Sequence, residues 1–156
     1  MPLDGEENEM QRKLLNDSNG QRTFAVILET GDEVQACMKT FIQAEGIRAA
    51  QLTAIGAFSD VELLYFDWKS KKYHKNAIAE QVEVASLIGD VVVSPSGESA
   101  LHIHVVVGRR DCTALAGHLG QAHVRPTLEV LLIESPTHLH KRFDKESGLA
   151  LIRTDT

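Results

Sequence analysis

Cysteine is scarce in this chain, which has only Cys37 and Cys112 among its 156 residues. They lie far apart and form neither a Cys-x-x-Cys motif nor a disulfide framework, so a reducing compartment is expected. A chain of this length can bury a core without disulfides or a structural metal. We therefore expect a single domain, and the cytoplasm is its expected location.

Long apolar runs and positive charge are also lacking. No run approaches 18 apolar residues, and residues 1–15 contain no apolar signal segment, so neither secretion nor membrane spanning is expected. The formal net charge is −6. Since duplex DNA is densely negative, any DNA role would need a local basic patch or a basic partner. There is no GxGxxG, P-loop or serine nucleophile elbow.

The first part of the chain predicts a tail and one helix. Residues 1–20 are polar and end in an Asn/Asp/Ser/Gly cluster, which predicts a flexible N-terminal tail before a domain over residues 21–156. Thr30 and Glu33 have the spacing of a capping box. Gly46 stands where a left-handed C-cap belongs. Between them, apolar residues recur at the spacing of an amphipathic helix: Val34, Cys37, Met38, Phe41 and Ile42.

The rest of the sequence has the pattern of strands. Gly89-Asp90 is expected to interrupt one of them as a bulge or tight turn. One helix among many strands predicts an α+β domain with a mainly antiparallel sheet. Its edges favour oligomerisation or a closed, barrel-like sheet. The expected strands cover residues 24–28, 51–55, 61–66, 73–79, 81–93, 101–107, 124–134, 138–144 and 149–153.

Three histidines form the main candidate site. His102 and His104 stand at i and i+2 on a strand pattern, so both side chains leave one face, about 6 to 7 Å apart. His118 follows in a Gly-His-Leu step, where a loop is expected to fold back. Three neutral imidazoles and an open position are typical of a zinc site, although copper, iron or nickel also fit. Alternatively, the pair on the strand is structural and satisfied by hydrogen bonds.

Other polar residues have weaker patterns. Glu83 and Glu129 lie within apolar strands, where alternation would place them on the solvent face. The alternative is that one accepts a hydrogen bond from a metal ligand or acts as general base. His123 is either a group near the metal or between subunits, or a surface loop residue. His138 and His140 adjoin basic residues and are expected on an exposed strand.

The residues around the histidines and the order of motifs along the chain distinguish between two candidate families. Cupins place a glutamate soon after His-x-His, but residues 105–110 contain no carboxylate, which disfavours a cupin. Instead, ordered pieces recur across residues 22–153: LTAIGA at 52–57, GAFSDV at 56–61, YFD at 65–67, EVASLIG at 83–89, LHIH at 101–104, GHL at 117–119 and PTLEV at 126–130. Together they resemble the PPC domain, the plant- and prokaryote-conserved domain, in its stand-alone prokaryotic form. The sequence departs from the family pattern at two places: at Ala116, where relatives often have glycine, and in the turn at 109–112.

The resemblance carries several expectations. It implies an α+β fold with a strongly curved antiparallel sheet, a homotrimer, and a metal, commonly zinc, at His102, His104 and His118. It also implies a distant similarity to the fold and three-histidine site of acetolactate decarboxylase. Plant members carry AT-hooks and act at DNA, but this chain has no Arg-Gly-Arg-Pro core.

Two functional interpretations remain open. The first is a trimeric metal-binding module with a regulatory role and a DNA or transcription-related partner. The second is a zinc-dependent lyase or hydrolase that binds a small molecule at the metal. In that enzyme the metal would be the Lewis acid, and Glu83 or Glu129 would handle protons.

Overall fold

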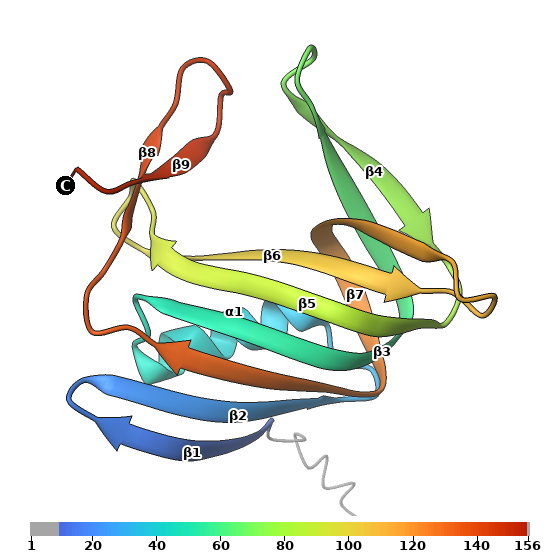
Figure 1. The fold of residues 1–156 in the computed structure, drawn as a ribbon, viewed down its shortest axis with the longest axis horizontal. Helices are drawn as coiled ribbons and strands as arrows, with labels where there is room; N and C mark the ends of the chain where they lie inside the picture. Colours follow the sequence, from blue (N-terminus) through green and yellow to red (C-terminus); the bar gives the residue numbers. More distant parts are fainter. Residues whose placement is uncertain (1–9, 156) are drawn as a thin grey trace, which may run out of the picture.

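The computed structural model describes residues 10–155, which form one helix and one nine-stranded sheet (Figure 1). The helix is α1 (Val34–Glu45). The strands are β1 (Gln11–Ser18), β2 (Gln21–Glu29), β3 (Ala50–Asp67), β4 (Lys72–Ile78), β5 (Val82–Val93), β6 (Ser99–Gly108), β7 (Ala114–Glu134), β8 (His140–Phe143) and β9 (Ala150–Arg153). The described part of the chain holds no helix long and apolar enough to cross a membrane.

The sheet curls until four of its strands form a closed circuit. β3 pairs with both β5 and β7, β5 pairs with β6, and β6 pairs with β7. These pairings are antiparallel, and the one parallel contact joins Val93 of β5 to His140 of β8. Register shifts between β3 and β7 mark bulges, which bend strands and increase their twist. The strongly curved, mainly antiparallel α+β fold predicted from the sequence is therefore confirmed.

Helix α1 packs on the core face of this sheet, where the ring of Phe41 meets that of Phe24 edge-on at 5.3 Å. Gly46 ends the helix in the left-handed conformation, as predicted. The predicted capping box is wrong, because Glu33 is itself the N-cap. Its carboxylate accepts hydrogen bonds from the backbone N–H groups of Gln35 and Ala36. A carboxylate suits this position because it faces the positive end of the helix dipole.

Strand β1 was not predicted. The expected tail over residues 1–20 includes residues 11–18, which pair antiparallel with β2, while residues 1–9 lie outside the described part. The turn explains the hairpin: Asn19 and Gly20 both have positive φ, 52° and 78°, as a two-residue type I′ turn requires. β1 is exposed along its length, so no hydrophobic alternation marks it as a strand.

The other differences concern strand length. Residues 51–66 form one strand, β3, rather than two, and β7 extends back from residue 124 to Ala114. β5 also continues through Gly89 and Asp90 without the expected interruption; its irregularity lies between Val84 and Ser86. A Cβ on Gly89 would lie 2.6 Å from the carbonyl oxygen of His102, so the glycine allows a close approach of two strands.

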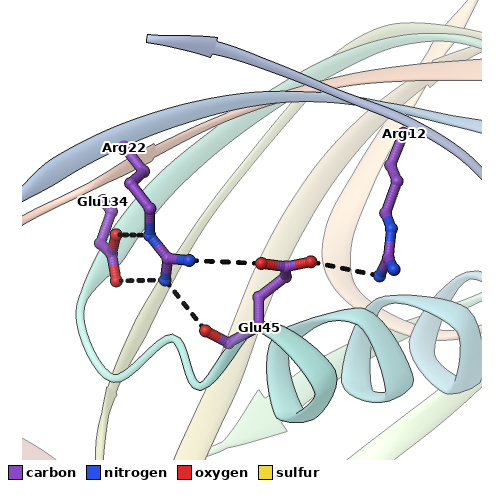
Figure 2. Close-up of polar contacts among 4 residues, drawn as sticks. All are labelled: Arg12, Arg22, Glu45 and Glu134. Carbon is purple, nitrogen blue, oxygen red and sulfur yellow. Dashed lines mark hydrogen bonds and ion pairs between the residues drawn. The ribbon is translucent and has the colours of Figure 1, made fainter. Parts of the chain in front are cut away.

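Arg22 connects the start of β2 to the ends of α1 and β7 through hydrogen bonds and ion pairs (Figure 2). Arg22 donates from Nε and Nη2 to the two carboxylate oxygens of Glu134, at 2.6 and 3.0 Å. It also donates to the carboxylate and the backbone carbonyl of Glu45, at 3.2 and 2.9 Å. Arg12 of β1 reaches only the far oxygen of Glu45, at 3.2 Å. Paired, bidentate hydrogen bonds of this kind are stronger than single surface ion pairs.

Replacing Arg22 by methionine is expected to lower the free energy of unfolding by about 2 to 3 kcal/mol, because Glu134 and Glu45 would lose their partner while partly buried. Arg12→Met removes the same charge from a more exposed site with one contact and is expected to cost less than about 1 kcal/mol. Urea unfolding of both variants measures the difference. Equal losses would contradict the role given to Arg22.

Candidate metal centre

The three histidines meet on two neighbouring strands. His102 and His104 lie on β6 and alternate with the buried Ile103 and Val105, so they point away from the hydrophobic core. His118 lies on β7 directly across from His104 in the antiparallel pairing. We expected His118 on a loop. The strand also brings its ring close to that of His104, because directly opposed residues have Cβ atoms about 4.5 to 5.5 Å apart.

The ring nitrogens lie close enough to share one ion. The Nε2 atoms of His102 and His104 are 3.1 Å apart, and one nitrogen from each histidine lies within 4.8 Å of the others. In tetrahedral zinc, N–Zn bonds of about 2.0 to 2.1 Å place neighbouring ligand nitrogens about 3.3 Å apart. Small rotations of the rings would therefore bring all three onto a metal.

The surroundings keep two of these histidines neutral. Burial lowers the pKa of His118 to about 4, with smaller contributions from the charges of His102, His104 and Lys141. Burial also lowers the pKa of His102, helped by Lys141 and opposed by the carboxylate of Asp90. A metal binds the neutral imidazole, so at neutral pH these rings need release no proton before binding.

Two polar atoms at the site have no partner in the described structure. Among the buried side-chain atoms of residues 10–155, only His118 Nδ1 and Asp90 Oδ1 lack a hydrogen bond. Such atoms are rare in folded proteins and call for an explanation, such as an ion. An ion held by the three histidines would occupy a nitrogen of each ring. The arrangement therefore fits a metal centre.

Asp90 is the residue at this site that the sequence did not reveal. It lies on β5 directly opposite His102, and its charge acts on that ring. A carboxylate beside a histidine ligand can orient the ring and increase its basicity. The sequence signal was hidden, because Gly89-Asp90 has the composition of a turn. Only the β5–β6 register brings the aspartate to the histidine.

The cluster lies beside an open hollow. A cavity of about 410 Å³ is lined by His102 and His104 together with Asp90, Ile88 and Thr53, among others. On another side, the ring of Tyr73 lies 5.1 Å from that of His118. His104 is exposed. A metal here would therefore keep a face open to solvent or to a ligand.

The two glutamates proposed from the sequence lie elsewhere on the sheet. Glu83 pairs with Gly108 and lies five residues along β5 from Ile88, the partner of His104, which is about 16 to 17 Å of strand. Glu129 pairs with Ile55 and Ile27. Both are exposed, and neither lines the hollow beside His102 and His104. Asp90 is the carboxylate that the fold brings to the histidines.

The remaining histidines are separate from the cluster. His123 lies on β7 rather than in a loop, and its Nδ1 is 2.9 Å from a carboxylate oxygen of Asp60. Hydrogen bonds from His123 and Ser59, the former the stronger, lower the pKa of Asp60. His138 and His140 are both exposed, the latter on β8, as expected. Within the described residues, these three belong to no group that could hold a metal.

The stability of the metal-free protein is expected to fall as pH decreases from about 6.5 to 4. The unfolded chain protonates His118 near its ordinary pKa of 6.5, whereas the folded chain resists protonation until about 4, so acid favours unfolding over this window. Urea unfolding in a chelator at pH 7 and pH 5 measures the loss. The His118→Gln variant should lose less, and an equal loss in both proteins would contradict the assigned shift.

Comparison with known proteins identifies a matching domain family and similar solved structures. Residues 16–136 match the Plants and Prokaryotes Conserved (PCC) domain. No curated protein matches the chain. A structure from Bacteroides thetaiotaomicron, described as a candidate DNA-binding protein, is 25% identical with a TM-score of 0.85, covering 96% of this chain and 100% of its own.

Two archaeal structures are also similar. A protein from Archaeoglobus fulgidus, described as metal-containing, is 29% identical with a TM-score of 0.78, covering 92% of this chain and 97% of its own. A plant- and prokaryote-conserved (PPC) protein from Pyrococcus horikoshii is 27% identical with a TM-score of 0.79, covering 96% of this chain and 97% of its own. The match over most of the chain, the curved sheet and these relatives lead to one conclusion: the chain belongs to the Plants and Prokaryotes Conserved domain family.

Proposed function

We propose that this chain is a zinc-binding module whose ion is held by His102, His104 and His118. The observation that carries the proposal is the convergence of three ring nitrogens within 4.8 Å on one face of the sheet. Three histidines with a fourth, open position are typical of zinc sites that bind a ligand. The description of the Archaeoglobus fulgidus relative as metal-containing supports a metal in this fold.

The module is proposed to act as a homotrimer, as the family resemblance implies. Support comes from the sheet face that points away from the core, where Ile55, Ile88, Leu131 and Ile133 are each 48% to 60% exposed. The pairing of β3 with β5 and β7 places them side by side. Large exposed apolar patches mark interaction sites, and a second and third copy of this chain are the proposed occupants.

The proposed role is regulatory, with DNA reached through a partner. The Bacteroides thetaiotaomicron relative is described as a candidate DNA-binding protein, which supports an association with DNA. The net charge of −6 and the missing AT-hook core favour a partner over direct contact. The two free cysteines, one of them exposed, support the cytoplasm as its location.

A second candidate function is a zinc-dependent enzyme that acts on a small molecule. The observation that favours it is Asp90, a carboxylate beside His102 at the edge of an open hollow. A metal there would supply Lewis acidity. In this enzyme Asp90 would orient the His102 ring or accept a proton, the role for which Glu83 and Glu129 were the candidates from the sequence.

Native mass spectrometry of the protein after zinc loading and removal of excess metal tests the proposal. The expected species is three chains with three zinc ions, because each chain carries one cluster. The same sample, mixed with duplex DNA of varied sequence at about 0.1 M salt, should show no binding. A protein that retains no zinc would contradict the metal site, and a single chain would contradict the trimer. Direct, tight binding to DNA would contradict the proposal that DNA is reached through a partner.

A further inference from the structure

The hairpin of β3 and β4 carries aromatic side chains that the hydrophobic core does not use. Figure 1 shows this hairpin rising away from β1, β2 and α1. Tyr65, Trp68 and Tyr73 are 67%, 55% and 40% exposed. Aromatic side chains left in water contribute little to folding, so several of them on one projecting hairpin indicate a binding surface.

Three of the rings form a continuous strip on one face of the hairpin. Phe66 and Tyr73 are directly opposed in the β3–β4 pairing, and their ring centroids lie 5.3 Å apart. Trp68 follows two residues after Phe66, and the centroids of these two rings are 6.5 Å apart. Tyr65 is instead opposed to His74, so it lies on the other face. We call Phe66, Trp68 and Tyr73 the aromatic strip.

Lysines make this hairpin basic within an acidic chain. Residues 62–75 contain four lysines and two carboxylates, whereas the whole chain has a net charge of −6. One of the lysines, Lys75, pairs with Glu62 at 3.4 Å. Within residues 10–155, the other three form no ion pair: Lys69, Lys71 and Lys72. Their positive charge is therefore available to an anionic partner.

The turn at the tip of the hairpin holds an aromatic ring and a positive charge together. The backbone N–H of Lys71 donates to the carbonyl of Asp67 at 2.9 Å, and that of Ser70 donates to the Asp67 carboxylate at 2.6 Å. The ammonium group of Lys71 lies 3.2 Å from the centre of the Trp68 ring. A planar group stacked on the strip would therefore have a cation beside it.

We propose that the β3–β4 hairpin binds single-stranded RNA, with bases stacked on the aromatic strip and phosphates bound by Lys69, Lys71 and Lys72. Proteins bind single strands through this combination of exposed rings and positive charge. The rings favour nucleic acid over an acidic protein segment, because carboxylate side chains have no flat ring to stack on them. A single strand is favoured over a duplex, because its bases can splay out and stack on a side chain. The inference goes beyond the metal-binding function proposed above and does not depend on it.

Trp68 is the only tryptophan of the chain, so tryptophan fluorescence reports directly on the strip. The full chain is titrated with a single-stranded oligouridylate of about 12 nucleotides, a length within the range of single-strand binding sites. Stacking of a base is expected to quench the emission of Trp68. A duplex RNA of the same length should leave the emission unchanged at concentrations where the oligouridylate saturates.

Trp68→Ala is expected to weaken oligouridylate binding at least about fivefold, because the stacking of one base is lost. The anisotropy of a labelled strand measures this affinity. Trp68→Phe keeps a ring and should stay within about threefold of wild type. Tyr65→Ala is the matched control, since it removes a more exposed ring from the other face of the same hairpin. It should change the affinity less than about twofold.

Lys71→Met should also weaken the salt dependence of binding. The slope of log affinity against log salt should become shallower by about 0.7, since one phosphate contact is lost. Lys39→Met, which removes an exposed charge from α1, is the control and should leave the slope unchanged.

No quenching by oligouridylate, or equal weakening by Trp68→Ala and Tyr65→Ala, would overturn the proposal. Two other results would overturn it by assigning the strip to a different occupant. Binding of polyglutamate in place of RNA would indicate an acidic protein. A lower oligomeric mass of Trp68→Ala than of wild type, measured by analytical ultracentrifugation, would indicate a second copy of this chain.

Discussion

Replacing His102 and His104 together by alanine is expected to lower zinc affinity by more than about a thousandfold. The double variant keeps one of three ligands, and a single imidazole does not retain zinc against water. Both side chains point away from the core, so the fold should survive, with a free energy of unfolding of the metal-free protein within about 1 kcal/mol of wild type. Competition with a chromophoric chelator measures the affinity, and urea unfolding measures the stability.

The chain offers a matched control in His138 and His140. They have the same i, i+2 spacing and are exposed, but they belong to no potential metal group among the described residues. The His138→Ala, His140→Ala variant should bind zinc as the wild type does. If both double variants lose zinc equally, or if neither does, the ion is not held by the β6 histidines.

Placing negative charges on the apolar sheet face is expected to convert the proposed trimer into monomers. Ile55→Asp combined with Leu131→Asp would put two carboxylates per chain into the proposed interface. Burying unpaired charges there costs several kcal/mol per interface, enough to shift dissociation by more than about a thousandfold. Analytical ultracentrifugation at micromolar concentration measures the mass, and native mass spectrometry checks it.

Leu14→Asp is the control for this experiment. Leu14 is 48% exposed, almost the same as Leu131 at 49%, but it lies across from the buried Phe24 on the helix side of the sheet. It should leave the oligomer intact. Dissociation by Leu14→Asp alone, or a wild-type protein that is already monomeric, would contradict the proposed interface.

The sequence predicted best those features that depend on local pattern. The helix stripe from Val34 to Ile42 and the left-handed Gly46 follow from side-chain periodicity and backbone sterics alone. The i, i+2 histidines likewise share a face because strands alternate. The ordered family pieces added what no local pattern contains, namely the strong curvature of the sheet.

The features that were missed depend on pairing between distant strands. Gly56 has the sequence signature of a strand end, yet it lies inside β3. A glycine stands there because a Cβ would overlap the carbonyl of Thr127 on β7. Asp90 has the signature of a turn, yet the register of β5 and β6 places it across from His102. A glycine or an aspartate looks the same in the sequence whether it lies in a turn or where two strands approach closely. Only the register of the strands distinguishes the two cases.

Diffraction from a crystal of the zinc-loaded protein, measured on both sides of the zinc absorption edge, tests the metal centre most directly. We expect one strong anomalous peak per chain, bounded by one ring nitrogen each from His102, His104 and His118 at about 2.0 to 2.1 Å. A strong peak on other residues, or no peak between these three rings, would contradict it.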